Sequence, residues 1–142
     1  MTPQQKELVR SSFTLLLPRA QHVAALFYKR LFELDPALRP LFQGSMNAQQ
    51  RKFMDTLDVA LRHLDRLDQI VPVLWQLGKR HGGYGVRDEH YDTVRTALLS
   101  ALSEELGEAF TPETEKAWMD IYDLMSITMK EASAEGIVPR PM

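Results

Sequence analysis

The sequence predicts an all-α fold, and three features of its pattern support this prediction. Apolar residues recur at positions i, i+3, i+4 and i+7 along almost every stretch, which is the spacing of one face of an amphipathic helix. Sustained alternation of apolar and polar residues is missing, as are the Asn-Gly and Asp-Gly pairs typical of β-hairpins. A Thr-Pro pair, which favours the start of a helix, occurs near the N-terminus and again in the last third of the chain.

The first two helices are predicted from caps and prolines. The run Thr2-Pro3-Gln4-Gln5 combines a capping hydroxyl, a Pro at the first helical position and a Gln three residues after the cap. Pro18 is expected to end this helix within a residue or two, because a proline disfavours helical geometry in the residue before it. A second helix is expected over residues 19–34. Pro36 can then start a short helical segment to about residue 42.

The middle of the chain is expected to contain two more helices. Residues 44–47 are interpreted as a turn that precedes a long helix. The apolar stripe of this helix comprises Met46, Phe53, Leu57, Ala60, Leu61 and Leu64. A polar stretch over residues 65–69 follows it. The next helix, over residues 70–81, is expected to end at Gly82-Gly83.

Two long helices are predicted for the last third. The first covers residues 87–106, and Gly107 follows it in the position that glycine favours after a helix end. Thr111-Pro112 starts the second by the same combination of cap and proline as at the N-terminus, and Trp118, on its apolar stripe, is expected in the core. A single domain over residues 1–136 is expected, with a frayed, Pro-rich tail at 137–142.

Composition excludes several classes of function. The 142 residues include 17 basic and 19 acidic side chains, and this net charge of −2 gives no attraction to a nucleic acid or an anionic membrane. The absence of cysteine excludes disulfides, thiolate nucleophiles, iron–sulfur clusters and cysteine-based zinc sites. The polar N-terminus and the lack of a long apolar run predict neither export nor a membrane span. A cytoplasmic location is expected, and both a monomer and a homodimer are compatible with the pattern.

The four histidines are the first candidates for chemistry. His22, His63 and His90 lie on or near polar faces and are interpreted as surface residues. His81 closes an apolar face and precedes Gly82-Gly83, so it is either a hydrogen-bonded core residue near a helix end or a metal ligand. The chain has no HxxxH or HExxH motif, so His81 could not hold zinc alone. It could serve as the axial ligand of a haem iron, which arrives with four ligands in place.

Two polar residues at the edges of apolar stripes could face a ligand bound to such an iron. Tyr28 borders the inward face of the second predicted helix, and Gln49 borders that of the third. Gln50 flanks the same stripe almost equally well. Each also has an ordinary interpretation, as a Gln at a helix edge or a Tyr that packs its ring with a solvated hydroxyl.

Taken together, these residues resemble the globin family, and most closely the bacterial single-domain haemoglobins related to the haem domain of flavohaemoglobins. The resemblance covers residues 4–129. The segments that carry it are Leu26-Phe27-Tyr28-Lys29-Arg30-Leu31-Phe32, Asp35-Pro36, Leu41-Phe42, Gln49 through Phe53, Gly78-Lys79-Arg80-His81, His90-Tyr91 and Ala117-Trp118. Their joint order and spacing make the resemblance specific.

The resemblance implies a three-over-three helical sandwich around haem b and assigns a role to each candidate. His81 would be the proximal ligand of the iron, and Tyr28 and Gln49 would form a polar pair facing the bound gas, with Gln50 as the alternative to Gln49. The apolar and aromatic contacts to haem and gas would come from Phe42, Phe53, Leu77, Tyr84 and Val86.

The family also joins a Tyr and a Glu to the proximal His, which increases its electron donation. Tyr91 stands at the Tyr position, and the alternative for it is core packing with a solvated hydroxyl. The Glu position falls on Ser133. Glu131 and Glu135 flank it, but an offset of two residues turns a helical side chain by about 200°. Strong electron donation is therefore not expected.

Two functions follow from the resemblance. The first is a haem protein that binds O2 with high affinity and, as a nitric oxide dioxygenase, converts NO to nitrate. Because the chain ends where a flavin-containing reductase domain would begin in flavohaemoglobins, we expect its electrons to come from a separate reductase. The second is non-enzymatic storage, scavenging or sensing of O2. A haem-free interaction module is a third class, which the presence of His81, Tyr28 and Gln49 argues against.

Overall fold

The computed structural model describes residues 2–42, 45–66 and 88–137, with side chains up to residue 130 and excepting that of residue 88. Helices form all the regular structure within these ranges. The α-helices are α1 (Pro3–Leu16), α2 (Ala20–Leu34), α3 (Met46–Arg62), α5 (Asp88–Leu106) and α6 (Pro112–Ile137). Short 3-10 helices lie at Leu17–Arg19, Pro36–Leu41 and Gly107–Ala109. The predicted all-α class is confirmed.

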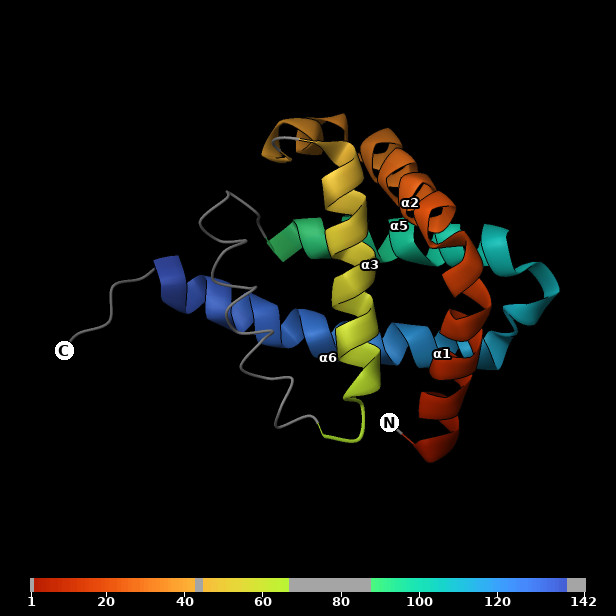
Figure 1. The fold of residues 1–142 in the computed structure, drawn as a ribbon. Coiled ribbons are helices and arrows are strands. Elements are labelled where there is room, and N and C mark those ends of the chain that lie inside the picture. The colour runs from red at the N-terminus through yellow and green to blue at the C-terminus, as the bar shows by residue number, and fades with distance from the viewer. Residues whose placement is uncertain (1, 43–44, 67–87, 138–142) are drawn as a thin grey trace.

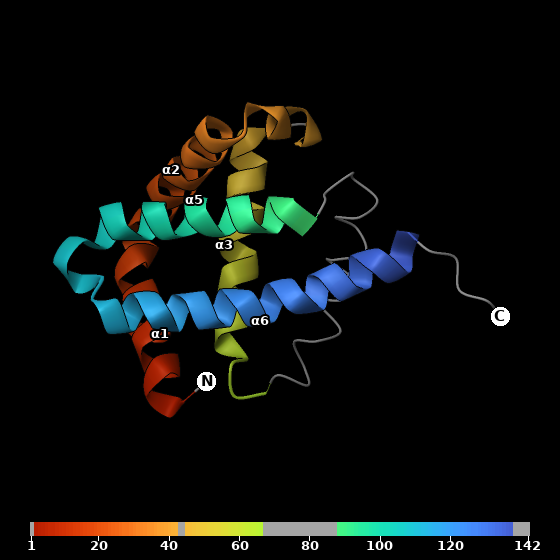
Figure 2. The ribbon, with the colours of Figure 1, turned by 180° about the vertical axis from the view of Figure 1, so that it is seen from behind.

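The helices form two crossing sets. Figures 1 and 2 show α5 and α6 side by side and antiparallel, with α3 crossing both of them. Helix α1 packs against α6, and α2 packs against both α3 and α5. The space between α2, α3, α5 and α6 is therefore enclosed by helices from both halves of the chain. None of the described helices is long and apolar enough to cross a membrane.

Local signals set the helix ends as predicted. The Thr2 hydroxyl accepts a hydrogen bond from the Gln5 backbone N–H at 3.1 Å, and the Gln5 side chain accepts one from the Thr2 N–H at 3.0 Å. The Thr111 hydroxyl caps α6 by accepting from the Thr114 N–H at 3.2 Å. Gly107 follows α5 with a φ of 56°, a backbone angle that favours glycine.

The expected turn over residues 44–47 is wrong for residues 46 and 47, which belong to α3. Ser45 is the N-cap of α3, because its hydroxyl accepts from the Ala48 N–H at 3.4 Å, and the helix begins at Met46. At the other end of the chain, α6 continues to Ile137, one residue into the expected tail. The predicted helix over residues 70–81 lies outside the described residues.

One buried hydrogen bond joins the first helix to the last. Trp118, predicted in the core, is 0% exposed, and its indole N–H donates to the Ser12 hydroxyl at 2.8 Å. The Ser12 hydroxyl in turn lies 2.7 Å from the Leu8 carbonyl, to which it donates. The polar atoms that α1 and α6 bury at their contact are thus paired.

Candidate functional site

A cavity of about 170 Å³ lies between α2, α3, α5, α6 and the 3-10 helix Pro36–Leu41. Its described lining is mainly aliphatic, methionine and aromatic. The aromatic members are Phe27, Tyr28, Phe42, Phe53, Tyr91 and Tyr122. The other polar members among the described residues are Thr56, His90 and Ser126. The cavity is therefore suited to an apolar ligand with few polar contacts.

The aromatic wall holds Tyr28 in place. The Tyr28 ring makes edge contacts with Phe27, Phe42 and Phe53, at centroid distances of 4.9, 5.4 and 5.9 Å. Phe27 and Phe53 stack in parallel at 4.2 Å. These contacts join α2, the segment after the 3-10 helix Pro36–Leu41 and α3, so three separate parts of the chain fix the orientation of one phenol ring.

The hydroxyl of Tyr28 is a protonated donor at neutral pH. Tyr28 is 6% exposed, and burial raises its pKa to about 12. The hydroxyl lies 3.5 Å from the Gln49 carbonyl oxygen, which is long for an O–H···O hydrogen bond. The Tyr28 hydroxyl is thus only weakly engaged by this carbonyl, and the residue lines a cavity in which a ligand could accept a hydrogen bond from it.

The two candidate glutamines of α3 have different surroundings. The Gln50 amide oxygen accepts from the Gln21 amide N–H at 2.7 Å, a contact that ties α3 to α2 on the exposed surface. Gln49 is half-buried, and its backbone carbonyl oxygen lies 3.5 Å from the Tyr28 hydroxyl. Neither Gln side chain belongs to the described lining of the cavity. The assignment of Gln49 rather than Gln50 to the site thus stays a prediction.

Tyr91 lines the opposite part of the cavity. It is 5% exposed and its hydroxyl oxygen is buried, which agrees with core packing but not with the solvated hydroxyl of that alternative. Its backbone carbonyl accepts a hydrogen bond from the Tyr122 hydroxyl at 2.6 Å, which ties the first turn of α5 to α6. Burial, with a smaller contribution from nearby Tyr91, raises the pKa of Tyr122 far above its usual range, so this hydroxyl stays a donor. The side chain of Ser133 lies outside the described residues.

The surface interpretation of His90 needs correction. His90 is half-buried and lines the cavity next to Tyr91. The spacing of four between His90, Val94 and Leu98, which all line the cavity, would have placed it there. His22 does lie at the surface, where its side chain is 70% exposed and its Nε2 is 2.7 Å from Glu105.

Some of the predicted site residues line this cavity, and others lie outside the described residues. His81, Leu77, Tyr84 and Val86 lie outside the described residues, whereas Tyr28, Phe42, Phe53 and Tyr91 line one cavity together. In the described part of the chain, no cluster of three acidic or histidine side chains is arranged to hold a metal ion. A cofactor that brings most of its metal's ligands with it would need few ligands from the described residues.

The described lining fits a flat apolar cofactor of that kind. Aromatic and aliphatic side chains supply apolar contact on several sides, and the Tyr28 hydroxyl and His90 ring supply the few polar groups. Crossing helices around such a cavity are typical of helical ligand-binding proteins. In these proteins, side chains on facing helices form the cofactor site.

Comparison with known proteins gives the family. The Globin family model matches residues 25–129. The chain belongs to the globin family, and the predicted fold is confirmed.

Two kinds of relative are similar over almost the whole chain. A flavohemoprotein of Chromobacterium violaceum is 33% identical over 133 residues, which cover 91% of this chain and 33% of the relative. Neuroglobin-1 of Oncorhynchus mykiss is 30% identical over 150 aligned positions, covering 96% of this chain and 94% of the relative. The chain thus spans about a third of the length of the flavohemoprotein and almost all of the neuroglobin.

Solved structures show the same fold. An engineered carbene transferase, made from a Rhodothermus marinus protein that carries the name of a nitric oxide dioxygenase, superposes with a TM-score of 0.86 at 27% identity. The match covers 95% of this chain and 94% of that one. A bacterial globin from Campylobacter jejuni gives a TM-score of 0.83 at 22% identity, covering 94% and 97% of the two chains.

Proposed function

We propose that this globin binds haem b in the cavity between α2, α3, α5 and α6, with His81 as the axial ligand of the iron. The apolar, aromatic lining supports this proposal, as does the flavohemoprotein relative. The chain has no cysteine for a covalent link to haem, which favours haem b. Phe42 would pack against the macrocycle, and Phe53 would be the apolar side chain nearest the bound gas.

The proposed activity is reversible binding of O2 and, with electrons from a separate reductase, oxidation of NO to nitrate. When bound, haem supplies an iron that takes up diatomic gases. The similarity to a flavohemoprotein and to a structure named as a nitric oxide dioxygenase supports the second part. The chain's own residues would orient the gas and keep water away from it.

The single observation that carries this proposal is the buried hydroxyl of Tyr28. It is protonated at neutral pH, and three aromatic contacts fix its ring in the wall of the cavity. A hydroxyl that donates to an O2 molecule carrying partial negative charge contributes about 1.5–3 kcal/mol. The apolar lining strengthens this bond, because little water competes for the donor.

The assignment of His81 is tested by His81→Ala, with His90→Ala as the matched control. We expect His81→Ala to lose the intense haem absorption after reconstitution, and external imidazole to restore it. His90→Ala should retain haem, because the proposal gives it no bond to iron. Equal haem retention by His81→Ala and the parent, with the same ligation spectrum, would overturn the proposal.

The dioxygenase part has its own test. The oxygenated protein is mixed with NO under anaerobic conditions, and we expect rapid conversion to the ferric form with nitrate as the product. Nitrate formation no faster than with free haem would exclude this activity. The protein would then be a non-enzymatic O2 binder, provided that reversible oxygenation is observed.

A further inference from the structure

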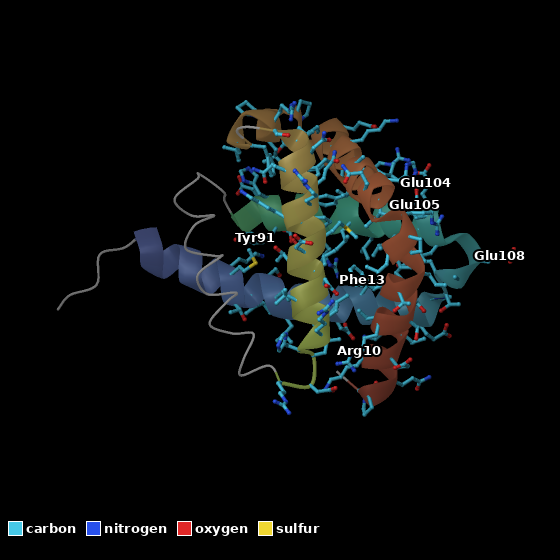
Figure 3. All side chains as sticks on the ribbon, in the orientation of Figure 1. Arg10, Phe13, Tyr91, Glu104, Glu105 and Glu108 are labelled. Atoms are coloured by element: carbon cyan, nitrogen blue, oxygen red, sulfur yellow. The ribbon has the colours of Figure 1, made fainter. Side chains whose placement is uncertain are left out.

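Lys130 of α6 places a positive charge against the wall of the cavity. Its Nζ lies 5.7 Å from the centroid of the Tyr91 ring, within the range of a cation–π contact. Lys130 is half-buried, and Tyr91 is 5% exposed and lines the cavity. Figure 3 shows Tyr91 at the start of α5, beside the second half of α6 and at the opposite end of α5 from Glu104 and Glu105. The charge is thus separated from the cavity by a single aromatic ring.

In the described part of the chain, the charged side chains near Lys130 do not form ion pairs with it. Arg95 and Asp123 pair with each other, with Nε and Oδ1 3.1 Å apart, so their charges offset one another. Asp92 is exposed, where water screens its charge. Among the side chains that the structure describes, no carboxylate forms an ion pair with Lys130. Among the described side chains, the charge of Lys130 is therefore not offset by an ion pair.

An apolar cavity screens such a charge poorly. Coulomb interactions strengthen as the effective dielectric constant falls from that of water toward that of a protein interior. A positive charge at the cavity wall disfavours any further positive charge inside the cavity. Ferric haem carries one more positive charge than ferrous haem, so the two oxidation states respond differently to Lys130.

We infer that the positive charge of Lys130 makes the haem iron easier to reduce. The inference rests on the proposed function. The reaction concerned is the one-electron reduction of ferric to ferrous iron, with the electron supplied by the reductase in the cell or by an electrode in the test. Lys130 shifts this equilibrium toward the ferrous form, the form that binds O2, without contact with substrate.

The test is a spectroelectrochemical titration of the haem-loaded full chain and three variants. Lys130→Met removes the charge and keeps most of the side-chain volume. We expect it to lower the ratio of ferrous to ferric protein at a fixed potential by about fourfold to sixteenfold, given an effective dielectric constant of about 20 to 40 and a separation on the order of 10 Å. A tenfold change corresponds to about 59 mV for one electron.

Two controls separate charge from packing. Lys130→Arg keeps the cation and its stacking, so its ratio should stay close to that of the parent. Lys116→Met removes a lysine from the same helix about 21 Å away, at about 1.5 Å per residue. It pairs with Asp120 at 3.0 Å and should leave the ratio unchanged, because this distance exceeds the screening length at physiological salt.

The possible outcomes distinguish this inference from the proposed function. If the parent binds haem normally and Lys130→Met has the same midpoint potential, the inference alone is wrong. It is also wrong if Lys130→Arg shifts the midpoint as far as Lys130→Met, because packing and not charge would then be responsible. A parent that shows no haem absorption after reconstitution overturns the proposed function and the inference with it.

Discussion

The Tyr28 side chain combines a buried hydroxyl with a ring that three aromatic neighbours hold in place. The ring contacts come from the adjacent Phe27 in α2, from Phe42 after the 3-10 helix Pro36–Leu41 and from Phe53 in α3. Sequence periodicity placed Tyr28 only at the border of an inward stripe. Burial to 6% exposure is a result of how α2 packs on α3 and α5.

Replacement of Tyr28 by Phe should speed the release of O2. The change removes one hydrogen bond of about 1.5–3 kcal/mol and keeps the ring, so release from the haem-loaded protein should become about 10- to 100-fold faster. Stopped-flow measurement of O2 release checks this, and an unchanged haem spectrum of the ferrous form serves as the control. An O2 release rate equal to that of the parent would show that this hydroxyl does not hold the gas.

The two neighbouring glutamines give a matched pair of variants. Gln49→Leu should speed O2 release by about tenfold if the Gln49 amide donates to the gas as proposed. Gln50→Leu should leave the rate unchanged, because the Gln50 amide is bonded to Gln21 at the surface. The same stopped-flow measurement serves both. A larger effect at Gln50 than at Gln49 would reverse the assignment.

At the scale of elements, one buried hydrogen bond contributes to the contact between α1 and α6. Trp118 is 0% exposed, and its indole N–H donates to the Ser12 hydroxyl. The apolar stripe of α6 predicted that Trp118 lies in the core. It could not identify the partner, because Ser12 is 106 residues away and helical periodicity carries no information about a facing helix.

Removal of this partner should destabilise the protein. Ser12→Ala leaves a buried indole N–H without an acceptor, and we expect the free energy of unfolding to fall by about 1–3 kcal/mol. Ser11→Ala is the matched control, since the Ser11 hydroxyl bonds Glu7 at the exposed surface, and its effect should be within about 0.5 kcal/mol. Urea denaturation of both variants measures the difference, and equal losses would argue against the importance of the buried bond.

At the scale of the whole molecule, burial of tyrosine hydroxyls predicts a loss of stability in alkali. The pKa of Tyr28 is about 12 in the folded protein and about 10 in an unfolded chain. The unfolded chain therefore loses its proton first as pH rises. Stabilisation is complete below about pH 10 and falls between about pH 10 and 12, by about 2–3 kcal/mol for Tyr28. Tyr122 acts in the same direction.

This pH dependence can be measured by comparing the parent with Tyr28→Phe. Urea denaturation at pH 8 and near pH 11.5 should show a smaller alkaline loss in the variant, because Phe has no proton to release. Between pH 6 and 8 the hydroxyl of Tyr28 should contribute no slope in either protein. If both proteins lose the same free energy of unfolding on the way to pH 11.5, the folded pKa of Tyr28 is not raised.

The amino-acid sequence determined the helices and many of their ends, because caps, prolines and glycines act over a few residues. Thr2, Thr111 and Gly107 each act where they were predicted to act. The order and spacing of residues around Tyr28 and Gln49 were also enough to indicate the family.

Only the tertiary structure decided which side chains meet at the cavity. It turned His90 from an expected surface residue into part of the lining, and it brought Lys130 to Tyr91 and the Tyr122 hydroxyl to the Tyr91 carbonyl. Each of these contacts joins α5 to α6 or to the cavity between helices. The physical reason is that periodicity determines which face of a helix is buried, whereas the crossing of two helices determines what that face contacts.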